Sequence, residues 1–304
     1  MTPRLIALDW GTSNLRACLL GDEATVLETR SGAGGVMAVP ERRFAEALLA
    51  LCGDWIAAHP VPLIASGMIG SRQGWVEAPY LDCPAGLADA AARLTRVAVT
   101  AEAVLHIVPG LHVIGPDGLD DVMRGEETQL WGADLVPGCC AVLPGTHSKW
   151  AWMGEGGGIT SFQTCMTGEL FALLSQHSIL GRLMVPGSAS PAAFEQGVRQ
   201  GLVAPEQLLH ALFTNRSSGL MKRWPGEALS DHLSGLLLGA EIGGALRLGV
   251  REPLALIGDE ALCGRYQVAL SLAGLASQPV AAGATTRGQW RVAEAAGLLE
   301  EDRR

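Results

Sequence analysis

Short apolar runs alternate with glycine-rich turns along the first third of the chain. A stretch from Phe44 to His59 carries apolar side chains at helical spacing and stops before Pro60. Runs rich in Leu, Ile and Val predict strands at residues 4–9, 15–20, 25–30, 62–65 and 104–108. Strands that alternate with a helix in this way are the material of one α/β domain.

The rest of the chain partly repeats this order. Both halves begin with a strand, a Gly-Thr turn and a second strand, which indicates a duplicated fold with its boundary near residue 115. We therefore expect lobes at residues 1–114 and 115–304, and the last helix could pack back on the first lobe. Strands are predicted at 141–143, 149–153, 158–164, 254–257 and 278–281, and helices at 124–134, 168–174, 191–201, 205–213, 230–248, from 260 to about 275, and 288–299.

Composition adds bounds on size, partners and location. The chain has 304 residues, 48% hydrophobic and 17% charged, which suits a globular protein of two domains. A net charge of −9 argues against nucleic acid or an anionic membrane as the main partner. The seven cysteines are scattered without C-x-x-C spacing, which is typical of a reduced, cytoplasmic protein. Glu241 and Arg247 interrupt the longest apolar stretch, and the early first strand leaves no room for a signal peptide.

Two glycine-threonine turns are the strongest candidates for ligand binding. Asp9-Trp10-Gly11-Thr12-Ser13 and Pro144-Gly145-Thr146-His147-Ser148 each join two predicted strands. Successive backbone N–H groups in such turns bind anions, and glycine allows a ligand to approach closely. Two turns so far apart in the chain suggest a phosphate chain held between two lobes. The sequence contains no P-loop, dinucleotide fingerprint, G-x-S-x-G or H-E-x-x-H, so phosphate binding must use another architecture.

Three residues of these turns have specific candidate roles. Asp9 could hold Mg²⁺ through water, because Mg²⁺ keeps much of its hydration; the alternative is an ordinary turn-capping residue. Lys149, one of only two lysines, is either a phosphate ligand or the outward residue of a strand. His147 is expected to hydrogen-bond within the turn rather than to bind metal, because no second histidine has ligand spacing.

Residues 8–16, 143–150 and 254–266 resemble the two phosphate motifs and the adenosine motif of the sugar-kinase, actin and heat-shock-ATPase superfamily. The resemblance implies an α/β fold of two duplicated ribonuclease-H-like, actin-like ATPase domains, with mixed sheets flanked by helices and a cleft between them. Asp259 departs from the motif, which often has a second glycine there. The implied contacts are phosphate at Gly11, Thr12, Ser13, Gly145, Thr146, His147 and Lys149, and adenosine at Gly258, Asp259 and Leu262.

Within that superfamily, the chain resembles the 2-dehydro-3-deoxygalactonokinase family more closely. The matching stretches are A-L-D-W-G-T-S-N-L-R, S-G-M-I-G-S-R-Q-G-W (66–75), M-R-G-E-E-T-Q-L-W-G (123–132), L-P-G-T-H-S-K-W and the segment 167–180. The resemblance implies phosphorylation of 2-dehydro-3-deoxy-D-galactonate at its terminal C6 hydroxyl, with ATP and Mg²⁺, in cytoplasmic galactonate breakdown. The implied partners are ATP and a small acid sugar.

The family's chemistry assigns roles to further residues. Where related carbohydrate kinases have Gly-Asp, this chain has Gly125-Glu126, so the resemblance implies Glu126 as the base, with Glu127 as the fallback. Alternatively, both are favourable charges at a helix N-terminus. An acid sugar needs arginine or backbone N–H groups, and each candidate arginine could instead form an ion pair. The substrate candidates are Ser66, Gly67, Met68, Arg72, Arg16 and Arg124.

Two other functions stay open from the sequence. One is a kinase of the same fold that acts on a related keto or hydroxy acid, such as 2-dehydro-3-deoxygluconate. The other is a nucleotide-switched binding protein without enzymatic activity. The sequence leaves both a monomer and a homodimer open.

Overall fold

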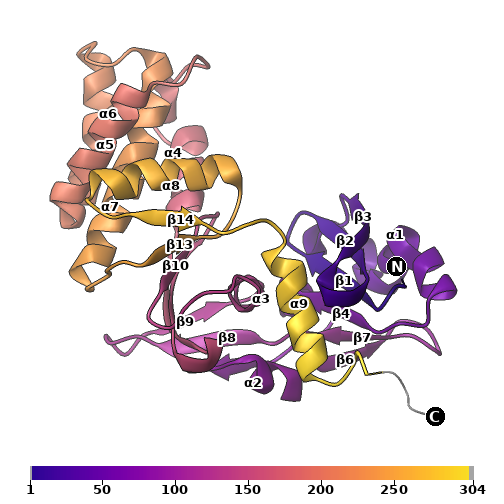
Figure 1. Ribbon diagram of the computed structural model, residues 1–304. Helices are drawn as coiled ribbons and strands as arrows, with labels where there is room; N and C mark the ends of the chain where they lie inside the picture. The colour runs from indigo at the N-terminus through magenta and orange to yellow at the C-terminus, as the bar shows by residue number, and fades with distance from the viewer. Residues whose placement is uncertain (1, 301–304) are drawn as a thin grey trace. The chain divides into compact units, whose positions relative to one another are not determined.

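The computed structural model describes residues 2–300, which contacts divide into two units (Figure 1). Of these residues, unit 1 takes those up to Gly138, residues 152–162 and those from Ala281 onward; unit 2 takes 139–151 and 163–280. The division differs from a single boundary near residue 115. The reason is that the strand Gly110–Ile114 pairs with Asp120–Met123, which keeps the chain after 115 in unit 1.

A mixed six-stranded sheet forms the centre of unit 1. Its strands lie in the order β3-β2-β1-β4-β7-β6, with β1 antiparallel to β2 and parallel to β4. Because side chains alternate along β1, Ile6 and Leu8 lie in the hydrophobic core on one face, whereas Asp9 lies on the other. The strands are β1 (Leu5–Trp10), β2 (Leu15–Leu20), β3 (Val26–Gly32), β4 (Leu63–Ser66), β6 (Thr95–Ala98) and β7 (Val104–Ile107).

Helices cover both faces of this sheet. Helix α1 (Phe44–Ala58) packs on β2 and β3, where it buries four residues at helical spacing: Phe44, Leu48, Cys52 and Trp55. Helix α9 (Ala284–Ala295) packs on β1 and β4 (Figure 1). Its Gln289 donates to the Leu8 carbonyl at 2.6 Å and to the Ser66 hydroxyl at 2.9 Å. The last helix therefore completes unit 1.

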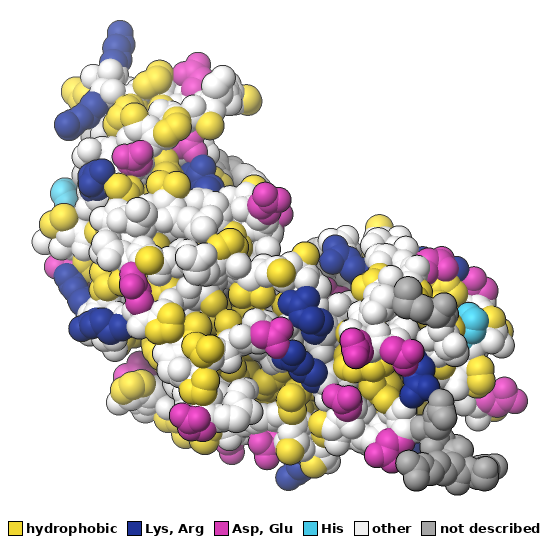
Figure 2. All heavy atoms as spheres, viewed as in Figure 1, with side chains coloured by type: hydrophobic (Ala, Val, Ile, Leu, Met, Phe, Trp, Pro, Cys, Tyr) yellow, Lys and Arg dark blue, Asp and Glu magenta, His cyan; other side chains and the backbone are white. Residues whose placement is uncertain are grey.

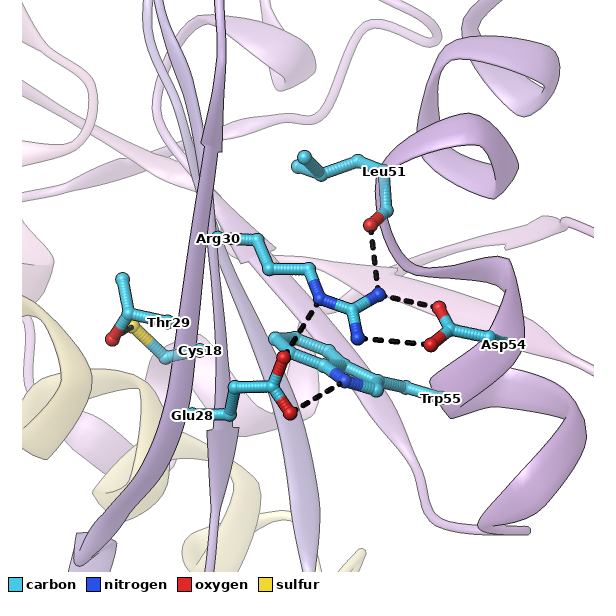
Figure 3. Close-up of polar contacts among 7 residues, drawn as sticks. All are labelled: Cys18, Glu28, Thr29, Arg30, Leu51, Asp54 and Trp55. Carbon is cyan, nitrogen blue, oxygen red and sulfur yellow. Dashed lines mark hydrogen bonds and ion pairs between the residues drawn. The ribbon is translucent and has the colours of Figure 1, made fainter.

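An arginine network fastens α1 to the edge strand β3 (Figure 3). The Arg30 guanidinium lies 4.2 Å from the centre of the Trp55 ring. Each of its three nitrogens donates to an acceptor: Nε to Glu28, Nη1 to the Leu51 carbonyl and Asp54, and Nη2 to Asp54. Arg30 is thus a fully hydrogen-bonded structural arginine.

A second, three-stranded sheet lies in unit 1 in the order β5-β8-β9. On β8, His112 bonds Asp82 of β5 at 2.6 Å and Asp120 of β9 at 2.8 Å; the two carboxylates raise the pKa of His112. This sheet was not predicted, and neither were α2 and β6. The elements of this region are β5 (Tyr80–Asp82), α2 (Leu87–Ala92), β8 (Gly110–Ile114) and β9 (Asp120–Met123), followed by α3 (Glu126–Trp131).

Unit 2 is built on a five-stranded sheet in the order β12-β11-β10-β13-β14. Strands β10, β13 and β14 run parallel, and β11 and β12 cross the division between the units. Figure 1 shows the helices gathered on this unit. The elements are β10 (Cys140–Leu143), β11 (Ser148–Met153), β12 (Ile159–Cys165), α4 (Thr167–His177), α5 (Pro191–Val203), α6 (Leu208–Leu220), α7 (Leu229–Arg247), β13 (Leu254–Leu256), α8 (Glu260–Leu272) and β14 (Ser277–Pro279).

Glycines let α5 and α7 pack backbone to backbone. A Cβ on Gly197 would lie 2.3 Å from the His232 carbonyl oxygen, and one on Gly235 would lie 2.1 Å from that of Phe194. Helix α7 is therefore buried on most sides, which explains its apolar composition. Among the described residues, no helix combines the length and apolar character needed to cross a membrane.

Charged side chains are spread over the face shown in Figure 2, where basic groups lie scattered among acidic and apolar ones. The remaining regular elements are short 3-10 helices. They lie at Asp22–Ala24, Val36–Ala38, Pro40–Arg42, Met68–Gly70, Glu155–Gly157, Gly181–Leu183, Pro205–Gln207 and Gly226–Ala228.

Candidate active site

The first glycine-threonine turn connects β1 to β2, and residues after β3 hydrogen-bond to it. Its Gly11 N–H donates to the Asn14 carbonyl at 2.9 Å. The loop after β3 donates three backbone N–H groups to carbonyls of the turn at 3.0–3.2 Å. The donors are Gly35, Val36 and Met37. A Cβ on Gly35 would lie 2.2 Å from the Ser13 backbone, so only glycine fits there. The backbone of the turn is therefore hydrogen-bonded to the loop after β3, while Thr12 and Ser13 are exposed.

Asp9 and Arg16 lie opposite each other on β1 and β2, in a cavity of about 400 Å³. Ser31 of β3 and Thr286 at the start of α9 also line it. Burial raises the pKa of Asp9, and the charge of Arg16 partly offsets this. A cation beside Asp9 would favour its ionised form.

The single carboxylate of Asp9 suits Mg²⁺ better than it suits a metal that needs several protein ligands. No group of three or more His, Cys, Asp or Glu residues suited to a metal occurs in the described part of the chain. Mg²⁺ needs no such group, because one carboxylate, water and phosphate oxygens can complete its octahedron.

Loop 66–71 leaves β4 beside the first turn. Gly67 has φ +93°, and a Cβ there would lie 2.9 Å from the Trp10 carbonyl oxygen. Ser66 is buried and its hydroxyl accepts the bond from Gln289, so this predicted substrate residue has a partner in α9. Met68 is half-buried in the 3-10 turn that follows. The loop therefore approaches β1 through its backbone.

Of the three candidate arginines, Arg72 is the one that the structure sets apart. Its side chain is 83% exposed and pairs with Glu77 at 3.4 Å. This is the surface ion pair that the sequence left as the alternative. Arg72 therefore lies outside the group of residues gathered around Gly67.

The start of α3 packs directly on loop 66–71. Gly125 has φ +109°, and a Cβ there would lie 3.2 Å from the Gly67 Cα. The half-buried Glu126 accepts the Arg124 N–H at 3.1 Å. The Arg124 side chain turns inward and donates from Nη2 to the Ala78 carbonyl at 2.8 Å. Unit 1 thus brings together the segments that carry Asp9, Gly67, Arg124 and Glu126.

Glu127 has a different environment from its neighbour Glu126. It is fully buried and accepts the Gly125 N–H at 2.6 Å and the Thr128 hydroxyl at 2.9 Å. Burial, and secondarily the charge of Glu126, raise the pKa of Glu127 to about 7. Glu127 therefore caps and supports the turn into α3.

The second glycine-threonine turn, in unit 2, rests on the N-terminus of α4. A Cβ on Gly168 would lie 2.4 Å from the Gly145 carbonyl oxygen, and the Glu169 N–H donates to the Thr146 carbonyl at 2.9 Å. The Glu169 side chain also pairs with the His147 ring, which joins the turn to α4. Lys149 is only 4% exposed and its Nζ donates to the His147 carbonyl at 3.2 Å. The outward orientation considered for Lys149 is therefore wrong.

The turn at Gly258, between β13 and α8, lies beside the second glycine-threonine turn. A Cβ on Gly258 would lie 3.4 Å from the Pro144 carbonyl oxygen. Asp259 is the N-cap of α8, and its carboxylate accepts the Leu262 N–H at 3.0 Å. Helix capping explains why an aspartate stands where relatives of the motif often have glycine.

A cavity of about 290 Å³ lies next to the second glycine-threonine turn within unit 2. Gly145 and Leu262 line it, together with residues that sequence reasoning missed. Three of these residues, Ser230, Asp231 and Ser234, are small polar residues at helical spacing in the largely apolar α7. That pattern could have predicted them from the sequence. The missed lining residues include Ser230, Asp231, Ser234, Arg265 and Tyr266.

A buried polar cluster lies behind this cavity. Glu241 of α7 accepts the Tyr266 hydroxyl at 2.9 Å and the Trp150 indole N–H at 2.8 Å. Burial raises the pKa of both Glu241 and Tyr266. Since Trp150 lies on β11, the cluster joins the strand after the second glycine-threonine turn to α7 and α8.

The chain is similar to known proteins over most of its length. A family model described as 2-keto-3-deoxy-galactonokinase matches residues 9–292. The 2-dehydro-3-deoxygalactonokinase of Escherichia coli strain K12 is 40% identical over 278 residues, 90% of this chain and 91% of that protein. A crystal structure of a provisionally named 2-dehydro-3-deoxygalactonokinase from Sinorhizobium meliloti has a TM-score of 0.86 and 35% identity, covering 96% of this chain and 98% of its own.

A distant structure supports the fold class alone. The xylulose kinase of Lactobacillus acidophilus has a TM-score of 0.51 at 9% identity, and covers 98% of this chain and 90% of its own. The predicted α/β fold class of sugar kinases is therefore confirmed. Because the family model spans nearly the whole sequence and a 40% identical relative matches most of it, the chain belongs to the 2-keto-3-deoxy-galactonokinase family.

Proposed function

We propose that the protein transfers the γ-phosphoryl group of ATP to the terminal C6 hydroxyl of 2-dehydro-3-deoxy-D-galactonate. Family membership over nearly the whole chain is the observation that carries this proposal. The close approach of Gly125, the neighbour of Glu126, to Gly67 supports it, because a half-buried carboxylate next to a glycine-rich loop can accept a hydroxyl proton.

Unit 2 supplies the proposed nucleotide site. The cavity next to Gly145 and Leu262 has apolar walls from Phe171, Leu237 and Tyr266, which suit a purine. Gly258 would lie at the base, and Asp259 would act through its cap on α8. The turns at 11–13 and 145–147 would each bind phosphate oxygens through N–H and hydroxyl groups. Because ATP is the donor, we propose that the protein acts in the cytoplasm.

One buried cation, Lys149, and one half-buried carboxylate, Asp9, complete the proposal. Lys149 would support the His147 end of the second turn from beneath, since its Nζ already bonds that carbonyl. Asp9 would hold Mg²⁺ through water. When bound, Mg²⁺ would neutralise charge on the phosphate oxygens during transfer.

The proposed step is an in-line displacement. The substrate's hydroxyl oxygen forms a bond to the γ-phosphorus, the bond from that phosphorus to the β–γ bridging oxygen breaks, and ADP leaves. The hydroxyl proton passes to Glu126. Glu126 suits this role better than Glu127, because Glu127 is fully buried and its oxygens already accept two bonds.

A substrate panel tests the function directly. Purified protein with ATP and Mg²⁺ should release ADP with 2-dehydro-3-deoxygalactonate, and more slowly with 2-dehydro-3-deoxygluconate. Coupled ADP detection measures both rates, with a reaction lacking sugar as the control for idle hydrolysis. Tight ATP binding without turnover of any keto acid would contradict the kinase and favour a nucleotide-switched protein.

Replacing the proposed base separates chemistry from binding. Glu126→Gln should lower kcat by roughly 10²–10⁴-fold, because the amide cannot accept the proton. The dissociation constant for ATP, measured by calorimetry, should change little. A near-normal kcat would remove Glu126 from the role, and the matched Glu127→Gln variant would show whether the neighbour holds it.

The raised pKa of Glu127 predicts a pH-dependent stability. Between its ordinary pKa of 4.5 and its folded pKa of about 7, Glu127 ionises first in the unfolded chain. The folded state therefore loses stability as the pH rises through this window, by at most roughly 3 kcal/mol. Urea unfolding at pH 5 and pH 7.5 should show this loss in the wild type and a smaller one in Glu127→Gln. Equal losses would show that Glu127 does not titrate as described.

A homodimer is a further proposal, with α6 as its contact surface. This helix exposes Leu209, Phe213 and, just beyond its end, Met221 at 86%, 59% and 77%. Figure 2 shows apolar side chains gathered at this end of unit 2. A second copy of the chain would cover them. Light scattering after size exclusion should give twice the chain mass, and Phe213→Glu should give a monomer; a monomeric wild type would overturn the proposal.

A further inference from the structure

We infer that Arg124 selects an acidic sugar over an uncharged one, and that Tyr80 is the residue that positions it. The inference rests on the proposed function and deepens it, because it assigns the recognition of the substrate's carboxylate. Neither the sequence motifs nor the family comparison distinguishes Arg124 from the other candidate arginines. The distinction comes from the hydrogen bonding and packing of its guanidinium.

The Arg124 guanidinium is buried with unused hydrogen-bonding capacity. The residue is 8% exposed, and its Nη2 donates to the Ala78 carbonyl at 2.8 Å. Within the described residues, only four buried side-chain polar atoms lack a partner, and two of them are Nε and Nη1 of Arg124. A buried charge without a counter-ion is costly, so such a group is stabilised when an anion pairs with it.

Arg30 in the same unit shows what a purely structural arginine looks like (Figure 3). Both guanidiniums lie over an aromatic ring, Arg30 at 4.2 Å from Trp55 and Arg124 at 4.3 Å from Tyr80. Every nitrogen of Arg30 is hydrogen-bonded, and Asp54 and Glu28 neutralise its charge. Arg124 has the same stacking, but two of its guanidinium nitrogens have no hydrogen-bond partner within residues 2–300. The stacking orients the group, and its charge remains for another partner.

Two glycines, Gly70 and Gly110, leave space for the Arg124 guanidinium and the Tyr80 ring. A Cβ on Gly70 would lie 2.9 Å from Nη1 of Arg124, and one on Gly110 would lie 2.7 Å from the Tyr80 ring. Gly110 is the residue opposite Tyr80 in the small sheet. The sheet β5-β8-β9 therefore carries Tyr80, and β9 leads directly into Arg124.

The position of Arg124 matches the proposed reaction. Gly70 belongs to loop 66–71, and the Arg124 backbone N–H bonds the proposed base Glu126. When the terminal hydroxyl of a sugar acid lies at Glu126, the positive charge of Arg124 lies behind loop 66–71, on which the acid would rest. A guanidinium attracts a carboxylate through charge and fork-shaped hydrogen bonding, whereas an uncharged group gains neither.

The test compares 2-dehydro-3-deoxygalactonate with its C1 primary amide, which keeps the hydroxyls and loses the charge. Binding is measured by calorimetry and turnover by ADP release, for the wild type and for Arg124→Met. The ratio of acid to amide affinity should fall roughly 10- to 100-fold in Arg124→Met, the range expected for one hydrogen-bonded charge. Arg30→Met is the matched control, and it should keep the wild-type ratio.

Tyr80 gives a second, independent readout. Tyr80→Leu removes the ring and should lower the acid-to-amide ratio in the same direction, through KM for the acid more than through kcat. Tyr80→Phe keeps the ring and should restore the wild-type ratio. The Tyr80 variants test the role of Arg124 in acid recognition even if Arg124→Met does not fold. Arg124→Lys retains the positive charge for comparison.

The outcomes separate this inference from the proposed function. An unchanged ratio in folded Arg124→Met, or in both Tyr80 variants when Arg124→Met does not fold, overturns the inference and leaves the kinase activity standing. Selective binding of the acid through Arg124 without any turnover would support the inference and contradict the kinase. A wild type that binds acid and amide equally would overturn the inference directly.

Discussion

Backbone contact at Gly67 is the constraint on which the candidate active site of unit 1 depends. A side chain at Gly67 would collide with the Trp10 carbonyl, and one at Gly125 would press on Gly67. Both glycines have positive φ, which other residues rarely adopt. Three segments distant in sequence can therefore meet through their backbones. The side chains of Asp9, Arg124 and Glu126 come together because of this contact and do not need to bond one another.

The last helix fixes the same arrangement from the other side. Gln289 bonds both β1 and β4, and a Cβ on Gly288 would lie 1.8 Å from the Thr128 carbonyl oxygen. Helix α9 thus packs on the strands beneath the first turn and on the helix that carries Glu126. Residues near the end of the chain determine the geometry of residues near its start, so truncating α9 would disturb the site without removing any proposed ligand-binding residue of the turns.

Local patterns and long-range contacts explain what the sequence could and could not predict. Strands β1, β2, β10 and β11 were predicted because their apolar runs and turn glycines are local signals. Strands β5, β8 and β9 were missed because they have three to five residues and polar positions such as Asp82 and Asp120. The arginines could not be ranked for a related reason. Arg72 pairs nearby with Glu77, whereas the environment of Arg124 is set by Ala78 and Tyr80, more than 40 residues away.

Burial and hydrogen bonding together separate supporting residues from reactive ones. Glu127 and Glu241 are buried carboxyls whose oxygens accept bonds from neighbours, so each can hold a turn or helix but has little freedom to accept a substrate proton. Glu126 and Asp9 are only half-buried, which leaves room for a ligand. Arg124 belongs to neither group, because it is buried like a supporting residue, yet its Nε and Nη1 have no hydrogen-bond partner among the described residues. The Tyr80 ring and the two glycines account for this state, since they can hold a guanidinium in place without neutralising its charge.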